Sequence, residues 1–195
     1  MRALTRKFMI YISLLVLSIG FSPMTHANDY ELQQVSNAGL VLSHVYIPTY
    51  FARLKLTYGQ QFVSKQAQVK AVHFLQLLAT GAGHYPESDL SLNKLLCGLS
   101  AEDSIEFNFV PTQEELLITE ELLKAMIANW RSLGNISVES LRESFILRNG
   151  DLVGQPEGAT LKIPRVAFDV LLSGLPYAIS PIKLPWMTKP LYVTW

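Results

Sequence analysis

The C-terminal segment Pro176–Trp195 reads PYAISPIKLPWMTKPLYVTW and combines four prolines with two tryptophans and two tyrosines, without an acidic residue. Proline fixes φ and lacks a backbone N–H, so this segment cannot form one continuous helix or a central strand. Its apolar side chains are too large to be left in water, so we expect the segment to dock on its own domain or on a partner. The candidate partner-binding residues are Pro185, Trp186, Met187, Tyr192 and Trp195.

The opposite end has the layout of a secretory signal peptide over residues 1–27. Arg2, Arg6 and Lys7 precede an apolar run, FMIYISLLVLSIGF, and a small-residue cleavage site follows before Asn28. The run is shorter than the roughly 20 residues that span a bilayer. A genuine signal predicts an exported, periplasmic or secreted protein. The alternatives are an uncleaved membrane anchor or a start that is not the natural one, with the chain then cytoplasmic.

Charge and length narrow the possible functions. The chain has 16 basic and 16 acidic residues, and removing the three N-terminal cations leaves 13 against 16, a net charge of about −3. This balance argues against nucleic acid as the main partner. Residues 28–195 are enough for one domain with a hydrophobic core. Cys97, the single cysteine, sits on an apolar face and is expected to be a buried thiol.

Helix signals recur along the chain, and the clearest lies at Thr112, where Thr112 and Glu115 form a capping box. Its expected buried stripe is Leu116, Leu123, Met126, Ile127 and Trp130, and Gly134 is expected to end it. Further helices are expected from Ala38 (capped by Ser36-Asn37), from Pro48 to before Gly59, from Ser64 to Gly81, from Ser88 through Leu96, from Ser137, and from Val166 to Leu172.

Strand signals are fewer. Ile105, Phe107 and Phe109 alternate with polar residues and predict a strand. Asn149-Gly150, between the apolar runs 145–147 and 152–153, predicts a hairpin turn there, and a further strand is expected at 161–163. The sequence therefore predicts one mostly helical α+β domain, with a few short strands, one hairpin and the proline-aromatic tail.

No catalytic or metal-binding constellation is visible in the sequence. The histidines at 26, 44, 73 and 84 lack the H-E-x-x-H spacing, and no cysteine spacing suits zinc. We interpret His73 as a satisfied core residue. The expectation is a protein without catalytic residues, metal or cofactor; an enzyme would need a pocket that gathers His73, His84 and a carboxylate.

Several segments in order resemble the C-terminal region of the contractile injection system tape measure protein family. They include NAGLVL at 37–42, AVHFLQ at 71–76 with LATG at 78–81, LNKLLCGL at 92–99, and IKLPWM at 182–187. Trp130 with Leu133, and SVE at 137–139, add to the set. The resemblance runs from about Val35 to Trp195.

This resemblance implies a structural component of a phage-tail-like particle, without reaction or cofactor, whose partners are protein subunits of a contractile tail or tube. Family members generally carry a long region ahead of this block. Even as one helix, residues 28–195 would span only about 250 Å. The chain is therefore expected to act as a terminal docking domain. The alternative is an exported binding module that shares the domain. Within LNKLLCGL, we expect a structural role for Asn93 and surface exposure for Lys94.

Overall fold

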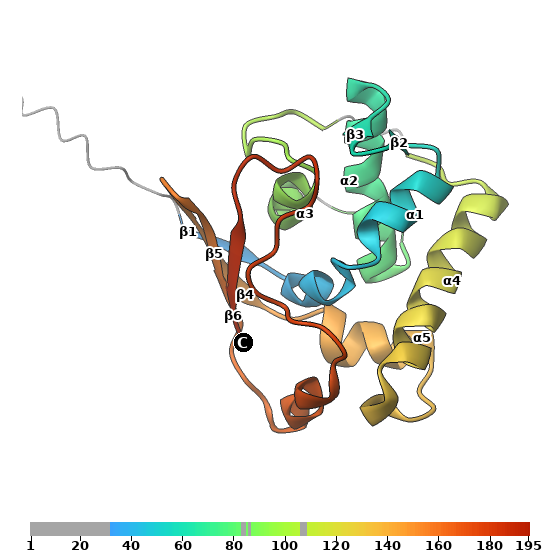
Figure 1. Cartoon of the computed structure of the whole chain (residues 1–195), viewed down its shortest axis with the longest axis vertical. Helices are drawn as coiled ribbons and strands as arrows, with labels where there is room; N and C mark the ends of the chain where they lie inside the picture. Colours follow the sequence, from blue (N-terminus) through green and yellow to red (C-terminus); the bar gives the residue numbers. More distant parts are fainter. Residues whose placement is uncertain (1–31, 83–84, 86, 106–108) are drawn as a thin grey trace, which may run out of the picture.

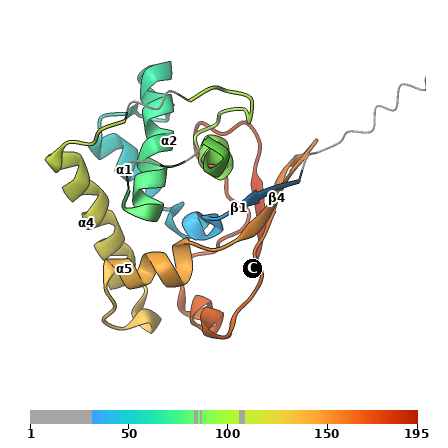
Figure 2. The ribbon, with the colours of Figure 1, turned by 180° about the vertical axis from the view of Figure 1, so that it is seen from behind.

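A four-stranded sheet forms one side of the molecule, and every helix lies on the same side of it (Figures 1 and 2). The computed structural model describes residues 32–82, 85, 87–105 and 109–195, so the predicted signal peptide lies outside the described residues. The strands run in the order β1-β4-β5-β6. Their bounds are β1 Leu32–Val35, β4 Gly150–Gln155, β5 Gly158–Lys162 and β6 Leu191–Thr194. β4 is antiparallel to β1 and β5, whereas β6 runs parallel to β5.

The alternation of apolar and polar side chains along the strands explains why one face of the sheet is buried. Leu152, Leu161 and Val193 are buried toward the helices, whereas Lys162 and Tyr192 are exposed on the other side. Successive residues of a strand point to opposite faces, so a sheet packed on one side reads as alternately apolar and polar. The strand predicted at Leu161 is therefore confirmed.

Helices cover the buried face of the sheet and enclose the core. Their bounds are α1 Ile47–Arg53, α2 Lys65–Thr80, α3 Ser91–Leu96, α4 Gln113–Asn129 and α5 Val138–Leu141. Short 3-10 turns are η1 Ala38–Ser43, η2 Glu87–Leu90, η3 Arg131–Leu133 and η5 Ala167–Gly174, and η4 Arg142–Ile146 is π-helical. The predicted class is confirmed: a mostly helical α+β domain with a small sheet and a hairpin. No helix of the described residues combines the length and apolar character needed to cross a bilayer.

Capping places the long helices where the sequence predicts them. The Ser64 side chain accepts a hydrogen bond from the Ala67 N–H, 3.0 Å away, at the start of α2. Thr112 and Glu115 form the predicted capping box of α4. Each cap supplies partners for backbone N–H groups that have none within the helix.

The hairpin predicted at Asn149-Gly150 is wrong. Phe145 continues α5 through the π-helical η4 and packs edge-on against Trp130, with ring centroids 4.8 Å apart. Gly150 lies inside β4, where a Cβ would come within 2.7 Å of the Ala38 side chain. The turn instead falls at residues 156–157, between β4 and β5. A short apolar run has the same composition in a buried helix as in a strand, and here the helical contact with Trp130 decides.

Several helix boundaries also differ from the prediction. Residues from Ala38 form a 3-10 helix, and the Asn37 side chain does not cap it because it is buried elsewhere. α3 begins at Ser91, after η2, so the start predicted from Ser88 is wrong. The segment from Val166 is likewise 3-10.

α4 ends at Asn129. Gly134, which was expected to end this helix, instead ends the separate turn η3. Leu116 remains 37% exposed, since the buried face runs through Ile118 and Leu122 instead. Ile105 and Phe109 are buried but have no strand assignment, and residues 106–108 of that predicted strand lie outside the described residues. A small hairpin, β2 Thr57–Tyr58 with β3 Gln61–Phe62, was not predicted.

Candidate docking surface

The C-terminal tail docks on its own domain. Trp186 stacks on Phe51 with ring centroids 5.4 Å apart and contacts Phe62 at 4.9 Å. Its indole N–H donates to the Leu96 carbonyl oxygen at 2.8 Å. The aromatic residue therefore joins α1, β3 and the end of α3. The tail was expected to dock on its own domain or on a partner, and these contacts are with its own domain.

The tail also covers the edge of the sheet. Ile182 and Leu191 exchange two backbone hydrogen bonds of 2.8 Å, so the chain folds back beside β6. The Val193 N–H donates to the Ser180 hydroxyl at 2.9 Å. Unpaired strand edges invite pairing with other chains, and these bonds occupy part of the β6 edge.

A buried ion pair fixes the last residue. Arg148 donates to the two carboxylate oxygens of Asp169 at 2.7 and 3.1 Å, and the Trp195 indole N–H donates to the same carboxylate at 3.0 Å. The Arg148 guanidinium lies 5.4 Å from the ring centroids of both Phe168 and Trp195. Burial raises the pKa of Asp169, but the hydrogen bonds from Arg148, the Val166 N–H and Trp195 outweigh it and leave that pKa below its ordinary value.

The five candidate partner-binding residues do not form one patch. Met187 and Trp195 are buried, and Trp186 is half-buried. Pro185 is exposed beside Trp186, whereas Tyr192, 45% exposed, lies on the far side of the sheet. The structure thus separates an exposed site near Trp186 from another at Tyr192. Their binding to a partner stays a prediction.

A buried amide cluster links the segments that resemble the tape measure family. The Asn37 side-chain amide donates to Gln76 at 2.9 Å and to Asn93 at 2.8 Å, and Asn93 donates to Gln76 at 2.9 Å. All three side chains are almost fully buried. The structural role predicted for Asn93 is confirmed. Buried polar groups of this kind stabilise a fold only when they are hydrogen-bonded.

Lys94 corrects the sequence interpretation. It was predicted on the surface, but only 6% of it is exposed, and its ammonium donates to the Ala101 carbonyl oxygen at 3.1 Å. A long aliphatic stem lets a lysine be buried while its charged end reaches a backbone carbonyl. The apolar pattern of a short helix cannot reveal this acceptor, because Ala101 lies in the loop after the helix.

The close approaches around the tail require glycine. Gly98 has φ of +72°, and a Cβ there would lie 2.7 Å from the Trp186 carbonyl oxygen. Both the left-handed backbone and the contact exclude an ordinary side chain. The segment LNKLLCGL at 92–99 thus contacts the segment IKLPWM at 182–187. The sequence alone does not predict this contact.

The enzyme alternative requires a pocket that gathers His73, His84 and a carboxylate, and only part of such a pocket falls among the described residues. The described residues contain no group of three or more histidine, cysteine, aspartate or glutamate side chains that could hold a metal ion. His73 is buried, its ring contacts the Tyr85 hydroxyl at 2.5 Å and stacks on Phe109, while His84 lies outside the described residues. The cavity beside His73, of about 420 Å³, has no carboxylate among its described lining residues. Burial raises the pKa of the Cys97 thiol well above its ordinary value, which keeps it protonated.

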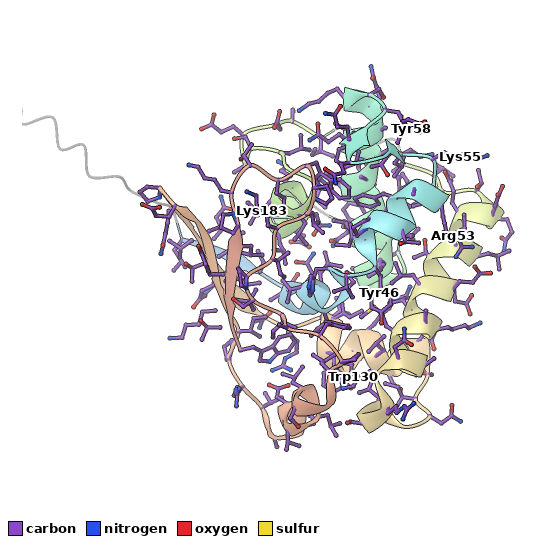
Figure 3. All side chains as sticks on the ribbon, in the orientation of Figure 1. Tyr46, Arg53, Lys55, Tyr58, Trp130 and Lys183 are labelled. Atoms are coloured by element: carbon purple, nitrogen blue, oxygen red, sulfur yellow. The ribbon has the colours of Figure 1, made fainter. Side chains whose placement is uncertain are left out.

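The most exposed aromatic side chain of the described residues lies next to the tail. Tyr58, on β2, is 88% exposed, and Val63 just after β3 is 57% exposed. Val63 follows Phe62, which contacts Trp186, and Tyr58 lies opposite Gln61 on the same hairpin. Pro185 is exposed and precedes Trp186 along the chain. Figure 3 shows Tyr58 and Lys55 on the same side of the molecule, with Lys183 of the tail well apart from them. We call Tyr58, Val63, Pro185 and the exposed part of Trp186 the tail ridge.

The fold is a small mixed sheet backed by helices, with an aromatic tail packed on its own domain. The model of the contractile injection system tape measure protein family matches residues 22–195, nearly the whole chain, and the chain belongs to that family. No curated protein and no solved structure matches it. The family is a structural one, and membership assigns the chain to contractile injection systems.

Proposed function

We propose that this chain is the terminal docking domain of a tape measure protein and binds subunits of the contractile tail through its tail ridge. The observation that carries the proposal is the exposure of Tyr58 and Val63 on the β2–β3 hairpin, whose Phe62 contacts Trp186 of the tail. Tyrosine and tryptophan are enriched among the residues that carry most of the binding energy of protein interfaces. Family membership supports tail subunits as the partners.

Site-specific photo-crosslinking tests the proposal. A photoreactive residue replaces Tyr58 or, in a second variant, Pro185, in cells that produce the particle. We expect crosslinks from both positions to a tail or tube subunit. The control places the same residue at Glu114, which is exposed on α4. Crosslinks only at the control position, or equal crosslinks at all three, contradict the proposal.

The cellular location depends on residues 1–27, and we propose that it follows from their processing. Intact-mass measurement on cytoplasmic and exported fractions distinguishes the two outcomes. A full-length chain inside the cell supports assembly into a particle there. A chain that begins at Asn28 outside the cytoplasm supports the alternative, an exported binding module.

A further inference from the structure

The side of the sheet that none of the described helices covers carries a row of three apolar or aromatic residues and a threonine. The strand registers place four residues side by side across the sheet, in the order Leu32, Val153, Thr160 and Tyr192. The two ends of the row are open, since Leu32 is 56% exposed and Tyr192 is 45% exposed. Figures 1 and 2 show all helices on the other side of these strands. We call this side the outer face.

A second row on the outer face is polar and charged. It runs in the order Gln34, Asp151, Lys162 and Thr194. Among the ion pairs of the described residues, none involves Asp151 or Lys162. Asp151 on β4 and Lys162 on β5 lie opposite each other at the centre of this row.

We propose that the outer face binds the outer face of a second copy of this chain. Two sheets pack face to face about 10 Å apart with nearly aligned strands. A two-fold axis along the strands, midway between β4 and β5, exchanges β4 with β5 and β1 with β6. Each residue then faces its row partner from the other half of the sheet: Leu32 faces Tyr192 of the second copy, and Asp151 faces Lys162.

Charge complementarity is what selects a second copy as the occupant. The two-fold arrangement makes two equivalent Asp151–Lys162 contacts between copies and brings no like charges together within either row. It also joins the exposed ends of the first row, Leu32 with Tyr192. An interface formed by the same patch on both copies must be self-complementary in this way.

The size of the outer face sets the expected strength. Four strands spaced about 4.8 Å apart and about 15 Å long give a footprint of roughly 300 Å². Stable complexes bury about 800 Å² per partner, so this interface alone predicts a weak dimer. Such a contact becomes populated where several copies are held close together.

Charge reversal and mixing test the proposal on the full chain by sedimentation equilibrium up to about 1 mM. Asp151→Lys or Lys162→Asp alone places like charges at both contacts, and we expect each variant to dimerise about tenfold more weakly. An equimolar mixture of the two variants restores both contacts between copies, so it regains dimer. Within each variant the neighbouring charges on β4 and β5 remain alike, so recovery on mixing reports the contact between copies.

Two controls keep the test decisive. Glu114→Lys and Lys124→Glu change the net charge in the same ways on α4, and neither should alter dimerisation. If a charge variant does not fold, Tyr192→Ala replaces it, with the exposed Tyr58→Ala as its match. A monomeric wild-type chain over the whole range overturns the proposal. So does association that the outer-face variants leave unchanged, or a mixture of folded variants that gains no dimer. The test uses the chain alone and is therefore independent of the proposed tail-ridge function.

Discussion

At the scale of single residues, buried polar side chains fix how distant segments meet. Asn37, Gln76 and Asn93 come from three separate motifs and hydrogen-bond one another in the core. The sequence indicates a structural role for Asn93 because a polar residue stands within an apolar helix. It cannot reveal the partners, since they lie 17 and 56 residues away along the chain.

Asn93→Leu should destabilise the domain by about 2–3 kcal/mol. The leucine keeps the branched shape but removes one partner each of Asn37 and Gln76, which leaves a buried N–H of Asn37 without its acceptor. Urea unfolding measures the loss. Asn129→Ala, which removes an exposed hydrogen bond to Tyr46, should change the stability by less than about 0.5 kcal/mol. Equal effects at the two positions would contradict the role of the cluster.

Asp169→Asn should destabilise the domain by about 3 kcal/mol, because the substitution leaves Arg148 buried without its counter-charge. Urea unfolding again provides the measurement. The matched variant Asp103→Asn breaks the exposed pair with Lys65 and should leave the unfolding midpoint nearly unchanged.

The same carboxylate predicts a pH dependence. The pKa of Asp169 is lower in the folded state than in the unfolded chain. Its contribution is therefore complete above the unfolded pKa, near 4, and is lost as the pH falls through the folded pKa. Wild-type and Asp169→Asn stabilities should therefore converge as the pH falls below about 4. A constant difference across that range would rule out this titration as the cause.

At the scale of elements, local signals predicted helices well and strand pairing poorly. Ser64 and Thr112 specify helix starts through bonds to residues three positions on, which a sequence displays directly. The placement of Phe145 depends on Trp130, and β6 depends on a parallel partner. Contacts of that kind have no local signal. The sequence predicted that the tail docks, but it did not predict that Trp186 contacts Phe51, Phe62 and Leu96.

Trp186→Ala should destabilise the domain by about 3 kcal/mol, because it removes the stacking on Phe51 and Phe62 and leaves a cavity. Thermal or urea unfolding measures the effect. The inward packing favours loss of folding over a selective loss of assembly. Tyr58→Ala is the control, since an 88% exposed side chain should contribute little to stability. A Trp186→Ala variant as stable as this control would show that the tail is not part of the core.

Gly98→Ala should cost more than Gly59→Ala, by about 1–2 kcal/mol. Both glycines have positive φ, +72° and +60°, so both substitutions carry a similar backbone strain. Only Gly98 has a neighbour in the way, the Trp186 carbonyl oxygen, whereas nothing lies within 4 Å at Gly59. The difference in unfolding free energy therefore measures the contact between tail and α3. Equal costs would mean that the tail yields freely.

At the scale of the whole molecule, the protein is a one-sided sheet backed by helices, with its tail folded into the core. The sequence predicted the fold class and the family. It did not predict which tail residues remain available. The structure leaves Pro185 and Tyr192 on separate surfaces, the tail ridge and the outer face, because the chain turns through the core between them.

The most direct test of the docking role is the composition of purified contractile particles. Particles are isolated from producing cells, and the amount of this chain in them is compared with the free pool by quantitative mass spectrometry. The account predicts that wild-type chain co-purifies with particles, and that substituting Tyr58 and Pro185 together shifts the folded chain to the free pool. A wild-type chain that is folded and abundant in the same cells, yet absent from the particles, would contradict it.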